Sequence, residues 1–217
     1  MRLYKYVMMY NNMTKAECIA LFNKNLILVN DVVMSPSYVV KDKDKITLSK
    51  SLITPLKNRY FLYYKPKGIL STLGNTNENL NNNLNLDFKV IPAGRLDKDS
   101  EGLLILSNDP LFIDSIMNSI DLIDKTYILT LKDVITTDFI NKLSNLKYLD
   151  GVSLKPFKFQ KLDNLHLSLT ICEGKYHQCR KMALLCGNKV VELKRIKIGK
   201  YNLSGMKPGD LIEISPR

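Results

Sequence analysis

The chain has 217 residues, of which 45% are hydrophobic and 24% charged, a composition typical of globular proteins that excludes a disordered or fibrous chain. No apolar run approaches the ~20 residues that cross a bilayer, and the N-terminus has no signal-peptide pattern, so we expect a cytoplasmic protein with no membrane partner. The net charge of +11 favours a polyanionic partner and is densest in residues 1–59, which hold ten Lys or Arg against four Asp or Glu.

The N-terminal fifty residues predict a small module of two helices and a few strands. Leu3, Tyr6, Val7 and Tyr10 fall at i, i+3, i+4 and i+7, which is one face of a short helix. Thr14 and Glu17 form a capping box, in which each side chain satisfies a free backbone N–H, and this box predicts the start of a second helix. Its apolar face is expected at Ala16, Ile19 and Ala20. Strands are expected at residues 26–29, 32–34 and 45–48.

Residues 51–58 are expected to be a linker, because they contain a proline and show no hydrophobic period. We therefore expect one domain at residues 1–50 and a larger one at residues 59–217. In the larger domain, strands and helices alternate without the regular rhythm of a doubly wound fold. This pattern predicts an α+β fold, built on a mixed, largely antiparallel sheet with flanking helices.

The larger domain has a clear order of expected elements. Strands are expected at residues 60–64, 103–106, 126–131, 165–171, 190–198 and 211–214. One helix is expected to start at Asp109–Pro110, with Leu111, Phe112, Ile116 and Met117 as its apolar residues. Two further helices are expected at residues 137–146 and 176–186. The asparagine-rich segment 75–85 is expected to be a surface loop.

Gly94–Gly102 (GRLDKDSEG) is a dense run of charges and glycines just before a buried strand. A calcium loop is excluded, because the twelfth position counted from Asp97 is Asn108 and not a bidentate glutamate. Two interpretations remain. One is a solvated turn, which composition alone favours. The other is an active-site loop, in which Asp97 supplies a carboxylate and Arg95 a guanidinium.

Residues 172–182 (CEGKYHQCRKM) place basic and hydrogen-bonding side chains where a helix begins, a position that suits a phosphate. Tyr176 and Arg180 are four residues apart, which would put them on one helical face. A solvated amphipathic helix explains the same run equally well. The four cysteines and two histidines have no zinc spacing, so we expect free thiols and no metal.

Four segments, taken in order, resemble the RsuA/RluB/RluE/RluF family of pseudouridine synthases: YFLYYKPKGILST, AGRLDKDSEGLLILSND, KTYILTL and EGKYHQCRKM…VVELKRIKIG. The resemblance covers residues 59–214, and its GRLDxxSEGLL part is highly specific. The first fifty residues resemble the small alpha-L RNA-binding module that commonly precedes this catalytic domain. The Tyr-His-Gln triplet and the VVEL…R…IG tail are most similar to the RsuA branch, which acts on 16S rather than 23S rRNA.

The resemblance implies catalytic roles for four residues. Asp97 falls on the catalytic aspartate that attacks the target nucleoside, and Arg95 on the arginine that pairs with it. Tyr127 falls on the aromatic residue that stacks on the flipped uracil. Arg180 falls on the basic residue that faces the carboxylate. The RNA-binding side chains are expected to be Arg2, Lys5, Lys15, Lys24, Lys65, Lys67, Lys175, His177, Gln178 and Lys181.

The implied function is the isomerisation of one uridine in ribosomal RNA to pseudouridine, with 16S rRNA favoured, either free or in a pre-ribosomal particle. This reaction is redox-neutral and hydrolyses nothing, so we expect no cofactor, and nothing in the sequence demands more than a monomer. Two alternatives stay open: a synthase acting on 23S rRNA, and a non-catalytic RNA-binding or ribosome-assembly protein. A pure binder would have no physical reason to retain the four catalytic residues, and only turnover separates the two classes.

Overall fold

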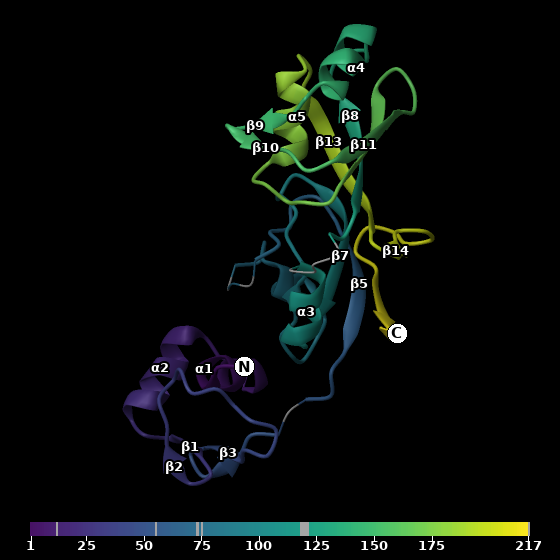
Figure 1. The fold of residues 1–217 in the computed structure, drawn as a ribbon. Coiled ribbons are helices and arrows are strands. Elements are labelled where there is room, and N and C mark those ends of the chain that lie inside the picture. Colours follow the sequence, from purple (N-terminus) through teal and green to yellow (C-terminus); the bar gives the residue numbers. More distant parts are fainter. Residues whose placement is uncertain (12, 55, 73, 75, 118–121, 217) are drawn as a thin grey trace. The chain divides into compact units, whose positions relative to one another are not determined.

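The computed structural model describes residues 1–11, 13–54, 56–72, 74, 76–117 and 122–216, and the chain forms two compact units. Unit 1 comprises Met1–Asn58 and Leu86–Lys89, and unit 2 comprises Arg59–Asn85 and Val90–Arg217 (Figure 1). Leu86–Lys89 thus groups with unit 1, although it follows the first strand of unit 2 in sequence. None of the helices in the described ranges is long and apolar enough to cross a membrane.

Unit 1 contains two helices and a four-stranded antiparallel sheet of order β2-β1-β3-β4. Its elements are α1 (Leu3–Tyr10), α2 (Lys15–Asn23), β1 (Ile27–Val29), β2 (Val32–Val33), β3 (Ile46–Leu48) and β4 (Ser51–Leu52). The expected helices and the first three strands are confirmed. Strand β4 falls where the linker was expected, because Ser49 and Lys50 adopt positive φ angles of 50° and 73° and turn the chain back onto β3.

The buried face of α2 differs from the expected one. Ile19, which was expected on the buried face, is 42% exposed, while Cys18 and Phe22 are buried, with 0% and 8% of their surface exposed. These two residues belong to the same core cluster as Leu3 and Val7 of α1. The prediction that Ala16, Ile19 and Ala20 form the apolar face was wrong, because the core of unit 1 selects the larger Phe22 side chain over the two small alanines.

The capping box of α2 is confirmed and supports a stability prediction. The Thr14 hydroxyl accepts a hydrogen bond from the Glu17 backbone N–H, and the Thr14 backbone N–H donates to Glu17 Oε2 at 2.7 Å. Replacing Thr14 by alanine removes one of these bonds, so we expect the free energy of unfolding to fall by about 1 kcal/mol. Urea unfolding monitored by circular dichroism measures this change. Thr14→Ser retains the hydroxyl and serves as the control; an equal loss in both variants would contradict the capping role.

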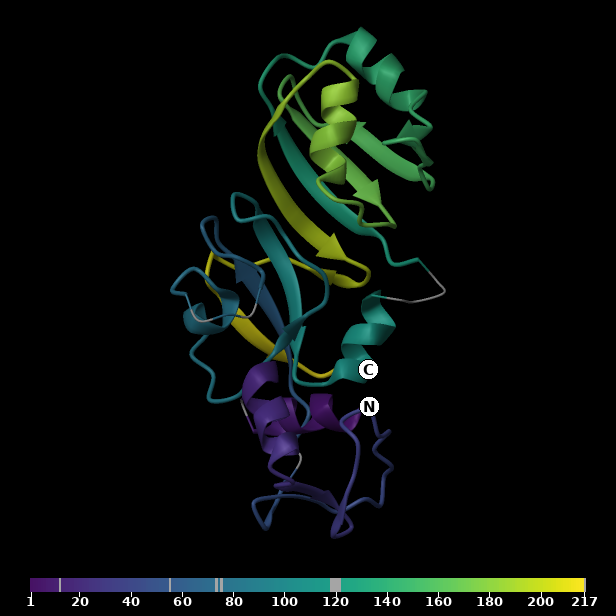
Figure 2. The same ribbon diagram turned by 90° about the vertical axis from the view of Figure 1, so that its left-hand side faces the viewer.

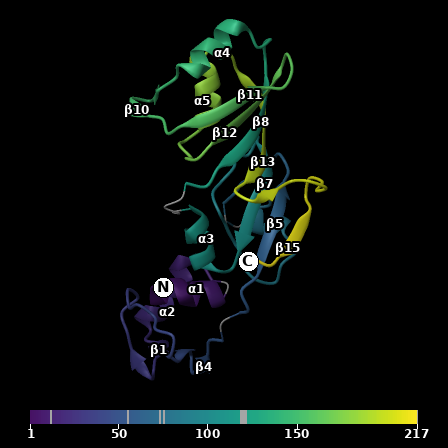
Figure 3. The same ribbon diagram turned by 45° about the vertical axis from the view of Figure 1, so that its right-hand side comes forward.

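Unit 2 is built on a mixed sheet of nine strands among the described residues, with a main order of β11-β12-β8-β13-β7-β5-β15 (Figure 3). Strand β14 pairs with β13, and β6 pairs with β7. Strands β13 and β7 run parallel, and the other pairs in this sheet are antiparallel. The expected α+β fold on a mixed, largely antiparallel sheet is confirmed.

The strands of unit 2 are β5 (Tyr60–Lys65), β6 (Ile91–Pro92), β7 (Glu101–Ser107), β8 (Lys125–Leu131), β9 (Tyr148–Leu149), β10 (Val152–Ser153), β11 (Phe157–Lys161), β12 (His166–Ile171), β13 (Val190–Ile198), β14 (Tyr201–Asn202) and β15 (Leu211–Ile214). Its helices are α3 (Pro110–Met117), α4 (Thr137–Ser144), α5 (Gln178–Leu185) and the short 3-10 helix η1 (Leu80–Asn83). The expected apolar strand at residues 103–106 is the fully buried middle of β7, between β5 and β13.

Three local expectations differ from the structure. Asp109 caps α3 as expected, accepting from the Leu111 N–H at 2.9 Å, but Leu111 itself is 76% exposed and Ile113 is buried instead. The segment 75–85 is not only a surface loop, since Leu80 within it is 0% exposed. Helix α5 begins two residues later than expected, so Tyr176 precedes the helix and does not share a helical face with Arg180.

Candidate active site

Asp97 lies in the loop that joins β6 to β7, and hydrogen bonds to the loop backbone hold it in place. The buried Ser71 hydroxyl donates to the Leu96 carbonyl at 2.7 Å and accepts from the Leu96 N–H at 3.0 Å. The Ser100 N–H donates to the Asp97 carbonyl at 3.1 Å and closes the turn. These bonds leave the Asp97 side chain 33% exposed, so its carboxylate is held in place and still accessible to a ligand.

The carboxylate of Asp97 is paired with side chains from the start of α5. His177 Nε2 lies 3.4 Å from Oδ1, and Arg180 Nε lies 3.7 Å from Oδ2. Helix α5 itself lies beside β13 (Figure 2). Two segments about 80 residues apart in the sequence therefore meet at one carboxylate, which a solvated turn would not require.

Arg180 is anchored by several partners around the loop. Its Nη2 donates to Asp99 Oδ2 at 2.9 Å and to the Ser100 hydroxyl at 3.1 Å, and its Nη1 donates to the Val190 carbonyl at 3.2 Å. These bonds orient the guanidinium so that its Nε faces Asp97. Arg180 is therefore held next to the Asp97 carboxylate.

Arg95 does not form the expected pair with Asp97. Its side chain is exposed, and no ion pair between the two residues exists in the described part of the chain. The backbone carbonyl of Arg95 instead faces inward and lies 3.5 Å from Arg195 Nη1. With the backbone turned inward in this way, His177 and Arg180 take the place of Arg95 beside the carboxylate.

Tyr127 and Arg195 form the buried part of the site. Tyr127 on β8 is 7% exposed, and burial raises the pKa of its hydroxyl. The guanidinium carbon of Arg195 lies 6.0 Å from the centre of the Tyr127 ring. Arg195 is 1% exposed and donates from Nε to the Leu103 carbonyl at 2.8 Å. Arg195 is the arginine of the VVEL…R…IG tail, but no role was predicted for it; the available signal was a cation two residues after Leu193, on the buried face of a strand.

Lys65 was expected to bind RNA, but its side chain is buried. It is 0% exposed and its ammonium donates to the Pro66 carbonyl at 2.9 Å. Burial lowers the pKa of Lys65 to about 8, although the charges of Asp97 and Asp99 favour the ammonium form. A buried cation therefore stabilises the negative charge of the Asp97 loop from the interior.

The low pKa of Lys65 predicts a pH-dependent effect of its replacement. Between pH 8 and 10.5 the unfolded chain binds more protons at Lys65 than the folded chain, so this residue makes the free energy of unfolding rise with pH. The stability of a Lys65→Met variant relative to wild type is expected to fall by up to about 3 kcal/mol from pH 7 to pH 10. Urea unfolding at both pH values measures this difference.

Lys67→Met is the matched control. The hydrogen bond from Lys67 to Glu192 raises the pKa of Lys67, so its contribution to stability is constant to pH 10 and is lost only above that. An effect of Lys65→Met that does not depend on pH would contradict a lowered pKa at Lys65.

Among the other expected RNA-binding residues, His177 lies beside Asp97, and the rest fall into two groups. The first group is exposed and consists of Arg2, Lys5, Lys15, Lys24 and Lys67. The second group brackets the start of α5: Lys175 Nζ donates to the Ser153 carbonyl at 2.8 Å, and Lys181 pairs with Asp150. Gln178 does not fit an RNA contact, because it is 4% exposed and its amide is bonded to Glu173 and to the Lys175 N–H.

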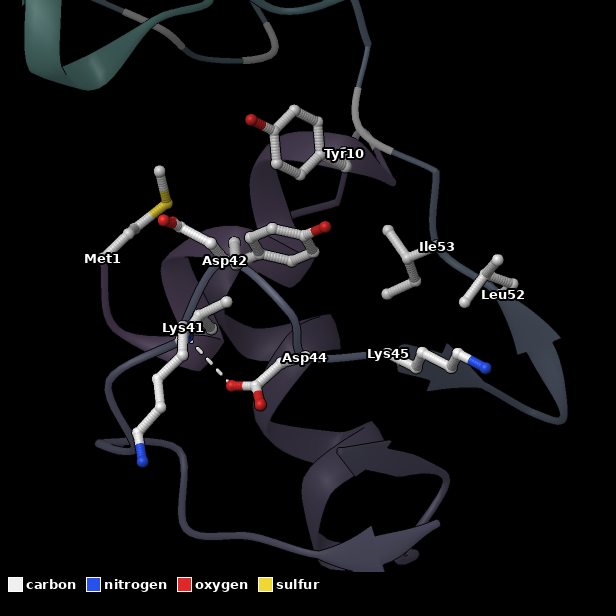
Figure 4. A pocket seen from close by; sticks show the side chains of 10 residues that line it. Met1, Tyr10, Lys41, Asp42, Asp44, Lys45, Leu52 and Ile53 are labelled. Carbon is white, nitrogen blue, oxygen red and sulfur yellow. Dashed lines mark hydrogen bonds between the residues drawn. The ribbon is translucent and has the colours of Figure 1, made fainter. Parts of the chain in front are cut away.

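Unit 1 contains a surface pocket with a volume of about 470 Å³ (Figure 4). Its walls are Met1, Tyr6, Tyr10, Val40, Lys41, Asp42, Asp44, Lys45, Leu52 and Ile53. Asp44 accepts from the Lys41 N–H and from the Tyr38 hydroxyl, both at 2.9 Å, so this carboxylate is occupied within unit 1. The ten wall residues include no histidine or cysteine, and the arrangement around Asp97 remains the better candidate for catalysis.

Comparison with known proteins identifies relatives over most of the chain. The family model described as RNA pseudouridylate synthase matches residues 59–185. Ribosomal large subunit pseudouridine synthase B of Bacillus subtilis is 31% identical over 82% of this chain and 76% of its own. Ribosomal small subunit pseudouridine synthase A of Haemophilus influenzae is 30% identical over 92% of this chain and 89% of its own. A crystal structure of a pseudouridylate synthase is 28% identical, with a TM-score of 0.69 over 99% of this chain and 96% of that one.

Proposed function

The chain belongs to the RNA pseudouridylate synthase family, in the group of the RsuA, RluB and RluF enzymes, and we propose that it isomerises one uridine of small-subunit 16S ribosomal RNA to pseudouridine. The observation that carries this proposal is the Asp97 carboxylate, held in a bonded loop and faced by His177 and Arg180. Such an arrangement keeps a carboxylate ionised and oriented, both of which a nucleophile needs.

In the proposed reaction, Asp97 attacks the target nucleoside and forms a transient bond to it as the C1′–N1 bond breaks. The base then turns, a C1′–C5 bond forms, and the bond to Asp97 breaks again, which restores the carboxylate. The C5 proton leaves and N1 gains a proton, so the product has the composition of the substrate and no co-reactant is consumed. Uridine must leave its base stack for this exchange. The Tyr127 ring, buried on β8, would stack on the extruded uracil, and Arg195 behind it would fix the orientation of that ring.

Two observations support 16S rRNA as the substrate. The triplet Tyr176-His177-Gln178 and the VVEL…R…IG tail are most similar to the RsuA branch. The small-subunit relative also aligns with 92% of this chain, against 82% for the large-subunit relative.

Residues 1–50 are proposed to act as an alpha-L type RNA-binding domain, joined to the catalytic domain by residues up to 58. Four of its expected phosphate contacts, Arg2, Lys5, Lys15 and Lys24, are exposed. Phosphate contacts of this kind add affinity and fix the position on RNA but carry no base specificity. Selection of the uridine is then left to the catalytic domain.

Pseudouridine mapping tests the function directly. Purified protein is incubated with transcribed small- and large-subunit rRNA, and with small subunits assembled in part, followed by carbodiimide-dependent reverse-transcription stops. We expect one new stop in small-subunit RNA. A stop in the large-subunit RNA would overturn the 16S assignment, and the absence of any stop in all substrates would favour the non-catalytic RNA-binding alternative.

A further inference from the structure

Tyr176 and His177 form a stacked aromatic pair next to Asp97. Their ring centres are 3.8 Å apart, with an angle of 20° between the planes. The inner ring, His177, reaches Asp97 with Nε2 at 3.4 Å, whereas Tyr176 is 74% exposed. An open aromatic surface therefore lies only one imidazole ring away from the candidate nucleophile.

The local backbone holds this pair in place. His177 has a φ of 53°, in the left-handed region that residues other than glycine seldom occupy. The turn before it is closed by the Lys175 N–H, which donates to Gln178 Oε1 at 3.0 Å, and by Gln178 Nε2, which donates to Glu173 at 2.7 Å. This bonded turn makes the exposed Tyr176 ring part of a defined structure.

One cation lies over the Tyr176 ring. Lys181 Nζ lies 5.6 Å from its centre, and the ion pair with Asp150 ties this lysine to the turn between β9 and β10. Lys175 is bonded to the Ser153 carbonyl at the end of the same hairpin. A planar ring with a lysine beside it suits a nucleotide, because a base can stack on the ring while a phosphate approaches the ammonium group.

Extruding a base leaves its neighbour in the RNA without a stacking partner on one side, and an exposed ring beside the catalytic cleft can replace that partner. Tyr127 is 7% exposed and is already assigned to the target uracil. We propose that the open face of Tyr176, supported by His177, is a stacking subsite for the nucleobase next to the target uridine in a single-stranded RNA segment. This inference rests on the proposed function for the identity of the target.

The subsite can be tested with a probe that does not require turnover. The probe is a pentanucleotide RNA with 2-aminopurine at its centre and uridines elsewhere, titrated with the full-length protein at low salt while the 2-aminopurine emission is recorded. Wild type and Tyr176→Phe are expected to quench the emission and to bind with similar affinity. Tyr176→Leu is expected to raise the Kd by about 5- to 150-fold, the range for loss of one base–aromatic stack.

Two controls separate stacking from a structural effect. Tyr148→Leu removes a ring that is 62% exposed on β9, and we expect this variant to bind like wild type. With an abasic nucleotide at the centre of the pentanucleotide, wild type and Tyr176→Leu are expected to bind equally. The proposal is overturned if wild type leaves the emission unchanged, if Tyr176→Leu binds the 2-aminopurine RNA like wild type, or if its defect persists on the abasic RNA. Failure of the pseudouridine mapping would not alter this binding assay, so the two proposals fail separately.

Discussion

An Asp97→Asn protein is expected to form pseudouridine at least on the order of 10³-fold more slowly than wild type, because the substitution removes the nucleophilic charge. The amide has nearly the same shape as the carboxylate, so the loop held by Ser71 and Leu96 should keep its structure. RNA affinity should therefore change much less than turnover. Single-turnover kinetics on the mapped RNA, with binding measured in parallel, checks both expectations.

Asp99→Asn is the matched control for Asp97→Asn, since both carboxylates lie in one loop and both face Arg180. Asp99 has a side chain that is 69% exposed, and exposed ion pairs contribute little free energy, so we expect its replacement to slow turnover by about fivefold or less. An equal fall in turnover in the two variants would show that turnover depends on the total negative charge of the loop, and would contradict a specific role of Asp97 as the nucleophile.

The elements that sequence reasoning located best are those with a strong local signal. The fully buried run Leu103–Leu106, the Asp109 cap of α3 and the Thr14–Glu17 capping box each depend on neighbours within a few residues. The hairpin of β9 and β10 escaped detection, because strands of two residues have no measurable period. The edge strand β11 is mostly exposed and lacks a continuous apolar face.

Four sequence motifs, taken in chain order, located the candidate site, but the contacts between its side chains depend on long-range packing. Adjacency in sequence suggested Arg95 as the partner of Asp97, whereas the structure places His177 and Arg180 there. His177 at the N-cap of α5 itself adopts a left-handed conformation, with a φ of 53°, and this conformation was not predicted from the sequence. The burial of Lys65 was equally hidden, because a lysine at the end of a strand is usually exposed.

Among the described residues, Gly102 is the position where we expect one added methyl group to lower the free energy of unfolding most. It has a φ of +120°, and a Cβ there would lie 2.3 Å from the carbonyl oxygen and 2.6 Å from the nitrogen of Arg195, the residue that it faces across the parallel β7–β13 pair. Both contacts are with backbone atoms, so the clash cannot be relieved by a side-chain rotation and must separate the two strands.

The Gly102→Ala variant is therefore expected to lose about 3 kcal/mol or more of unfolding free energy, from backbone strain and overpacking together. Separation of β7 from β13 would also move Arg195, which supports Tyr127, relative to the Asp97 loop that enters β7, so turnover should fall with stability. Denaturant unfolding and pseudouridine formation on the mapped RNA measure the two effects. Gly174→Ala is the stability control, because a Cβ at Gly174 has no atom within 4 Å; a Gly102→Ala protein as stable as this control would show that β7 and β13 do not need their close approach.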